Sequence, residues 1–129
     1  HVKAGWLPPV LEALDTLDIV SPSHSGDGQL GHRHREFCGV MFAMRREAWD
    51  RFGPMDETDF KVRKGDQDFA IRARMAGADL GIVEASQFSH VAPKHTKAKH
   101  GPKVLERETA AFRAKYGAAT YARWRKLHQ

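Results

Sequence analysis

The chain has 129 residues, of which 41% are hydrophobic and 29% charged, and its formal net charge is +5. These values are typical of one soluble globular domain that is long enough to bury a core. The sequence contains no signal-peptide pattern and no apolar run near the ~20 residues that a membrane-spanning helix needs. The single cysteine, Cys38, excludes an internal disulfide. We therefore expect a reducing compartment, the cytoplasm, with a position at the membrane surface as an open alternative.

Basic residues crowd toward the C-terminus, where Glu106 and Glu108 are the only acidic residues after residue 94. Such a bias suits a polyanionic partner, which could be nucleic acid, a phospholipid surface or a nucleoside diphosphate. The alternative is a solvated helix surface. Nucleic acid is the least favoured partner, because aromatic residues are not interleaved with the basic ones and no helix-turn-helix or zinc pattern occurs.

Apolar spacing and turn residues predict alternating helices and short strands. In chain order we expect a helix over 7–14, a strand over 17–21, a polar loop over 22–36, a buried strand over 37–44, a helix over 45–52, a loop over 55–64, a helix from 66 to 77, strands over 79–83 and 87–91, a loop over 92–101, and helices over 104–116 and 119–127. This order indicates an α/β fold in a single domain with a mixed sheet.

Two carboxylates, Asp66 and Asp68, stand at the start of the helix expected over 66–77. A helix start favours anionic groups, because its first N–H groups are unpaired and its dipole end is positive. Both residues could therefore cap or charge the helix start, and Asp66 could instead be a general base at the edge of a pocket. We expect the helix to bury Phe69, Ala70 or Ile71, and Met75.

Several blocks of sequence resemble, in their residues and in their order along the chain, those of a known family. They are residues 5–7 (GWL) with 19–22 (IVSP), 38–48 (CGVMFAMRREA), 52–57 (FGPMDE), 66–77 (DQDFAIRARMAG) and, downstream, 84–90 (EASQFSH). In these blocks the chain resembles the second half of a family 2 glycosyltransferase of the GT-A fold. The resemblance implies a partial GT-A, Rossmann-like domain with flanking helices that lacks the N-terminal nucleotide-binding strands.

The resemblance also implies an activity: transfer of a sugar from a nucleotide-sugar donor to a carbohydrate or other acceptor hydroxyl, with inversion and with Asp66 as general base. The chain departs from the family at Gly65, which replaces an acidic residue, and in lacking the Asp-x-Asp motif. That motif is expected a few residues before His1, so the sequence reads as a fragment or a half-domain. A non-catalytic structural or assembly module of the same ancestry is the alternative.

On the acceptor side the resemblance implies Asp56, Glu57 and Gly39 as binding residues. Asp56 could instead bond its own backbone in the turn after Gly53-Pro54. Half a sheet would also leave strand edges unpaired, so a partner chain could cover the open edge.

On the donor side the resemblance implies Lys94, His95 and Lys97 as diphosphate-binding residues, and His90 as a ligand of Mn²⁺ or Mg²⁺ held together with the missing Asp-x-Asp motif. The alternative for the lysines is a flexible charged loop.

Three further features leave two interpretations each. His24, His32 and His34 could form a zinc site, although no cysteine accompanies them, so an acceptor-facing loop is favoured. Arg72 and Arg74 lie two residues apart and do not share a helix face, so we expect one to pair with a carboxylate and the other to be exposed. For Trp6, core packing is favoured over sugar stacking.

Overall fold

The computed structural model describes residues 1–24, 36–62, 64–89 and 95–127, with the helical backbone alone at 95–100 and 124–127. Its elements are α1 (Leu7–Ala13), β1 (Ile19–His24), β2 (Ala43–Met44), α2 (Arg46–Phe52), α3 (Gly65–Met75), β3 (Leu80–Phe88) and α4 (His95–Leu127). The fold is mixed α/β, as the sequence predicted. Within the described ranges, no helix combines the length and apolar character needed to cross a membrane.

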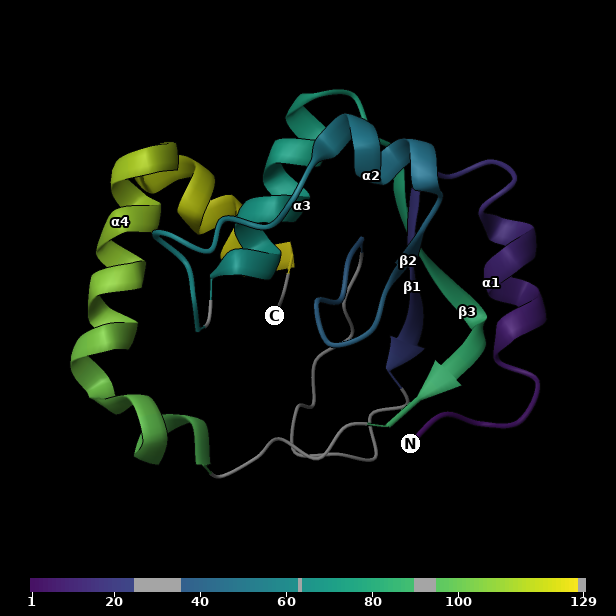
Figure 1. Cartoon of the computed structure of the whole chain (residues 1–129), viewed down its shortest axis with the longest axis horizontal. Helices are drawn as coiled ribbons and strands as arrows, with labels where there is room; N and C mark the ends of the chain where they lie inside the picture. Colours follow the sequence, from purple (N-terminus) through teal and green to yellow (C-terminus); the bar gives the residue numbers. More distant parts are fainter. Residues whose placement is uncertain (25–35, 63, 90–94, 128–129) are drawn as a thin grey trace.

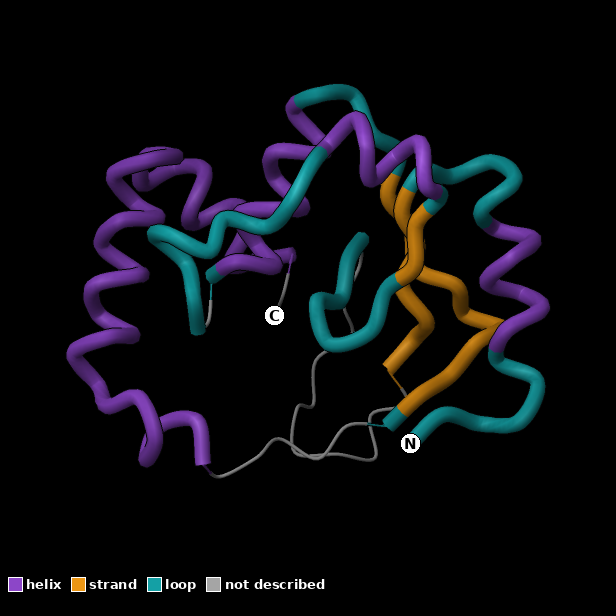
Figure 2. Tube along the Cα trace, in the orientation of Figure 1, coloured by secondary structure: helices purple, strands orange, loops and turns teal. Residues whose placement is uncertain are grey.

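The three strands form one mixed sheet in the order β2-β1-β3. The central strand, β1, is antiparallel to β2 and parallel to β3. All residues of β1 are buried, because helices cover both faces of the sheet. Figures 1 and 2 show α1 on one side of the strands, and α2, α3 and α4 on the other.

Successive side chains of β1 point to opposite faces of the sheet, and each face has its own core. Ile19 packs into the larger cluster, with Phe69 of α3 and Phe112 of α4. Val20 packs with Val10 of α1 in a smaller cluster, against which Trp6 also lies. The predicted core role of Trp6 is therefore confirmed.

The buried strand expected over 37–44 is wrong for most of its length, since only Ala43 and Met44 pair with β1. Residues 38–41 turn instead, with the Met41 N–H donating to the Cys38 carbonyl at 3.3 Å. The apolar character of this run reflects burial against α3: the Phe37 ring lies 6.5 Å from that of Phe69. The strand expected over 17–21 begins at Ile19 and continues to His24, so residues 22–24 are not loop.

The two strands expected over 79–83 and 87–91 form one strand, β3. The predicted turn between them is wrong, because β3 passes Glu84, Ala85 and Ser86 without reversing. Its pairing with β1 shifts there: Pro22 pairs with Val83, and the next residue of β1 pairs with Gln87. A bulge of this kind absorbs extra residues in one strand while the ladder resumes beyond it.

The helix over 66–77 and both C-terminal helices are confirmed, with two corrections. The loop expected over 92–101 is wrong from His95 onward, where α4 begins; α4 is broken by left-handed backbone at Gly101 and Gly117, with φ of 70° and 80°. Met75 is 77% exposed, because the last turn of α3 extends beyond the core. Gly77, with φ of 88°, ends that turn.

Candidate functional site

The first turn of α3 presents Asp66 at a pocket. Lys64 is the N-cap residue, and its side chain makes no capping hydrogen bond. Asp66 lies in the first turn, where its Oδ1 accepts the N–H of Gln67 at 2.9 Å. The carboxylate therefore satisfies one of the first-turn donors without occupying the cap position. Asp66 thus accepts a backbone N–H of the helix start, as the capping interpretation predicted, but the N-cap residue is Lys64.

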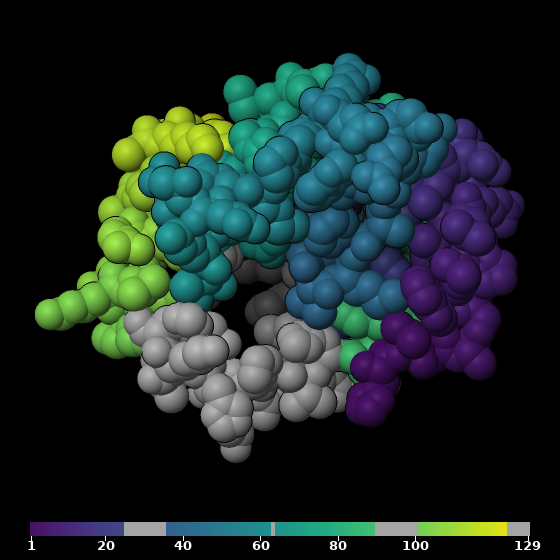
Figure 3. Space-filling view, in the orientation of Figure 1, coloured from purple at the N-terminus to yellow at the C-terminus, as the bar shows by residue number. Residues whose placement is uncertain are grey.

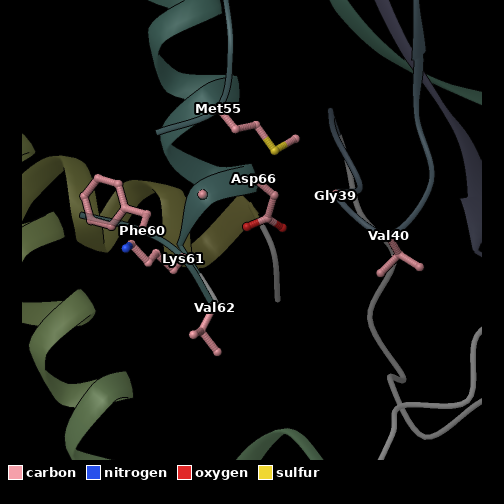
Figure 4. Close-up of a pocket in the computed structure, with 8 residues that line it drawn as sticks. Gly39, Val40, Met55, Phe60, Lys61, Val62 and Asp66 are labelled. Atoms are coloured by element: carbon pink, nitrogen blue, oxygen red, sulfur yellow. The ribbon is translucent and has the colours of Figure 1, made fainter. Parts of the chain in front are cut away.

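The pocket beside Asp66 has a volume of about 380 Å³. It is lined by Gly39, Val40, Met55, Phe60, Lys61, Val62, Gly65 and Asp66. Figure 4 shows the Asp66 carboxylate directed into the space between the segment before α3 and the turn that carries Gly39 and Val40. In the space-filling view the surface is hollowed between these two segments, teal and blue in Figure 3. The predicted base and one predicted acceptor residue, Gly39, thus share a pocket.

Gly39 and Asp66 are packed so closely that no side chain fits at position 39. A Cβ added to Gly39 would overlap the Cβ and the carboxylate of Asp66. The turn itself is tethered to the sheet, since the N–H of Cys38 donates to Ser21 Oγ at 2.9 Å. The opposite wall of the pocket thereby fixes the space that the Asp66 side chain can occupy. Burial raises the pKa of the Cys38 thiol.

A second pocket of about 400 Å³ adjoins the first and shares three lining residues with it. It is lined by Met55, Asp56, Glu57, Phe60 and Lys61. Two residues predicted to bind the acceptor, Asp56 and the exposed Glu57, therefore lie beside the pocket of Asp66.

Asp56 itself is engaged by its own turn. Its Oδ1 accepts the N–H groups of Thr58 and Asp59, each at 2.9 Å, and its Oδ2 lies 3.4 Å from Lys115 Nζ. The backbone hydrogen bond from Asp59 is the main reason that the pKa of Asp56 is lowered. The prediction that Asp56 bonds its own backbone is confirmed, and its acceptor role stays a prediction.

Asp68 is structural. Its side chain is fully buried, and it contacts Arg72 Nε at 2.8 Å, Lys115 Nζ at 2.7 Å and the Tyr116 hydroxyl at 2.6 Å. Burial by itself would raise the pKa of Asp68, but the hydrogen bonds from Lys115, Tyr116 and Arg72 outweigh it and lower the pKa. As expected, one arginine of the pair, Arg72, anchors the helix. Arg74 is exposed, although it also pairs with Glu36 at 2.9 Å.

Glu108 and Lys64 are buried charged residues that sequence reasoning missed. The Glu108 carboxylate accepts the N–H of Val62 at 2.9 Å and that of Lys64 at 3.3 Å. Lys64 Nζ donates to Gln67 Oε1 at 2.8 Å and lies 5.4 Å from the centre of the Phe112 ring. One signal was available: Glu108 stands one helical turn before the core residue Phe112, on the same face of the helix.

The predicted donor side falls largely outside the described residues. His90 and Lys94 lie outside them, while His95 and Lys97 lie in the first segment of α4, where the backbone alone is described. His32 and His34, predicted as part of a zinc site or of an acceptor-facing loop, also lie outside the described residues. His24 is buried in β1 and packs edge-on against Phe88, with ring centroids 5.2 Å apart. Among the side chains that the structure describes, no group of three or more histidine, cysteine or acidic residues could hold a metal ion.

Comparisons of the chain with protein-family models, with curated proteins and with solved structures found no match. The site itself offers three features: one carboxylate at a pocket, the close approach of Gly39 to that carboxylate, and an adjoining pocket with two further acidic residues.

Proposed function

We propose that this chain supplies the general base and the acceptor side of an inverting glycosyl transfer from a nucleotide sugar. The proposal is supported above all by Asp66, whose carboxylate lies in the wall of a pocket with one oxygen bonded to Gln67 N–H. The order of sequence blocks that resembles the GT-A glycosyltransferases supports it as well. In this proposal the sheet and helices are the C-terminal part of a GT-A domain.

The chemistry assigns one proton transfer to Asp66. The acceptor hydroxyl attacks the anomeric carbon from the face opposite the diphosphate, a C–O bond forms, and the bond from the sugar to the diphosphate breaks. Asp66 takes the hydroxyl proton as the new bond forms. The positive end of the α3 dipole favours a negative charge at this position, and the charged form of a carboxylate is the one that accepts a proton.

The donor side needs groups that the described residues do not show. A divalent cation, Mn²⁺ or Mg²⁺, offsets charge on the departing diphosphate in such reactions. His90 as its ligand, and Lys94, His95 and Lys97 as diphosphate contacts, belong to the proposal, together with nucleotide-binding residues from outside this sequence.

Two observations favour a second candidate, a non-catalytic module. Asp56 and Asp68 are both committed to internal contacts, and Gly65 stands where the resemblance places an acidic residue. Of the two acidic residues in the block 66–77, Asp66 lines a pocket and Asp68 does not.

The test is nucleoside diphosphate release from a panel of nucleotide sugars, with Mn²⁺ and hydroxyl acceptors, by the complete gene product. We expect Asp66→Asn to lower the rate by about 100-fold or more, the usual contribution of a positioned base. The matched control is Asp59→Asn, an exposed carboxylate that lines neither pocket. An inactive wild type, or full activity in Asp66→Asn, would overturn the proposal in favour of the non-catalytic module.

A further inference from the structure

Lys115, in α4, bridges two carboxylates that belong to different parts of the chain. Its Nζ lies 2.7 Å from Asp68 Oδ1 and 3.4 Å from Asp56 Oδ2. Its neighbour Tyr116 donates a hydrogen bond to the same Asp68 oxygen at 2.6 Å. One turn of α4 thus holds both the start of α3 and the turn after α2, on the side of α3 that faces α4 in Figure 1.

Both held segments form walls of the two pockets. Asp68 lies two residues after Asp66, within the first turns of α3. Asp56 directly follows Met55, which lines both pockets, and itself lines the second. A displacement of either carboxylate therefore moves a wall of the space into which Asp66 points.

The bridge is electrostatically favourable. Burial alone would lower the pKa of Lys115, but its hydrogen bonds and charge interactions with Asp68 and Asp56 outweigh this and raise the pKa. Lys115 therefore keeps its charge at any physiological pH, and a cation between two carboxylates holds them near each other. Tyr116 adds a directional contact and packs its ring 4.9 Å from that of Phe112.

We propose that Lys115 and Tyr116 are positioning residues, which set from α4 the location of Asp66 and of the wall that carries Asp56. The consequence for catalysis rests on the proposed function, whereas the effect on geometry does not. Neither residue lines either pocket, so their action on a bound molecule passes through Asp68 and Asp56.

The geometric test is the NMR spectrum of the ligand-free protein, read at the Asp66 side-chain carboxyl carbon and at the Gly39 amide. We expect Lys115→Met to shift both signals and Lys115→Arg to restore them. The matched control is Lys103→Met, at an exposed position of the same helix, which leaves them unchanged. If Lys115→Met fails to fold, Tyr116→Phe serves in its place. This variant retains the ring packing, and we expect it to give a smaller shift of the same signals.

Unchanged Asp66 and Gly39 signals in Lys115→Met and Tyr116→Phe, with Asp68 signals altered, would overturn the inference. In the transfer assay, we expect Lys115→Met to lower kcat by about tenfold with the donor KM unchanged, since small displacements of a catalytic group are costly. An inactive wild type would refute the proposed function and leave the NMR result standing, so the two failures are distinguishable.

Discussion

Asp68→Asn is the substitution from which the structure predicts the largest loss of stability at nearly constant volume. It removes the negative charge that three groups share: Arg72 at 2.8 Å, Lys115 at 2.7 Å and the Tyr116 hydroxyl at 2.6 Å. The Asp68 side chain is fully buried, so water does not replace the lost carboxylate.

The magnitude follows from the burial of each partner. Breaking a buried ion pair by removing one partner costs about 3–5 kcal/mol. The Lys115 and Arg72 side chains are 36% and 30% exposed, so their released charges are partly hydrated. We therefore expect the lower end of that range, a loss of about 3 kcal/mol in the free energy of unfolding. For a domain of this size, the loss corresponds to a fall in Tm of roughly 10 °C.

The assay is urea and thermal unfolding followed by circular dichroism, at pH 7 and at several acidic pH values. The folded-state pKa of Asp68 lies below its ordinary value, so its stabilising contribution is present above an unfolded pKa of about 3.9. That contribution is lost as the pH falls through the folded-state pKa. The difference between wild type and variant should therefore shrink below about pH 4.

Asp59→Asn serves as the control, because Asp59 is exposed and only its backbone takes part in the turn of Asp56. A loss below about 1 kcal/mol for Asp68→Asn, typical of an exposed pair, would refute the reasoning. A difference from wild type that stays constant down to pH 2 would refute it equally, since it would exclude the ionised carboxylate as the cause.

Gly39→Ala should destabilise the protein by about 1–3 kcal/mol and displace the Asp66 side chain, because the added methyl overlaps it; unaltered urea unfolding and an unaltered Asp66 carboxyl signal would contradict this. Glu108→Gln should lower the free energy of unfolding in urea by about 2 kcal/mol. The amide NH₂ would face a backbone N–H that now donates a hydrogen bond to the carboxylate. Equal stability of variant and wild type would show that the second acceptor is not needed. Because the pKa values of Lys115 and Tyr116 are raised, both residues should contribute to the free energy of unfolding below about pH 10, and this contribution should be lost as the pH rises further. Tyr116→Phe should weaken this alkaline loss of stability, and an identical profile would contradict the assignment.

Helix positions were predictable because their signals are local. Gly53 and Gly77 end helices with positive φ, and both ends were expected from the sequence. The strands were less predictable, because an apolar run such as residues 37–44 can be buried against a helix as well as in a sheet. The continuous course of β3 past Ser86 depends on pairing with β1, which is a tertiary effect.

Within the candidate site, sequence reasoning separated Asp66 from Asp68 and foresaw that Asp56 could bond its own turn. It did not find Lys115 or Glu108, whose partners lie more than 40 residues away along the chain. A basic residue on an exposed helix is ordinarily solvated, so nothing local distinguishes Lys115 from Lys103.

The tether of Cys38 to Ser21 has a consequence for the binding of a ligand in the pocket. The hydrogen bond holds one side of the pocket against the sheet. Glu108 and Lys115 hold the other side against α4. The two sides of the pocket are therefore held by different elements, which pack together in the larger core cluster. A molecule that contacts both sides binds the folded form and stabilises it. It should slow amide hydrogen exchange in α4, although no described side chain of α4 lines either pocket beside Asp66.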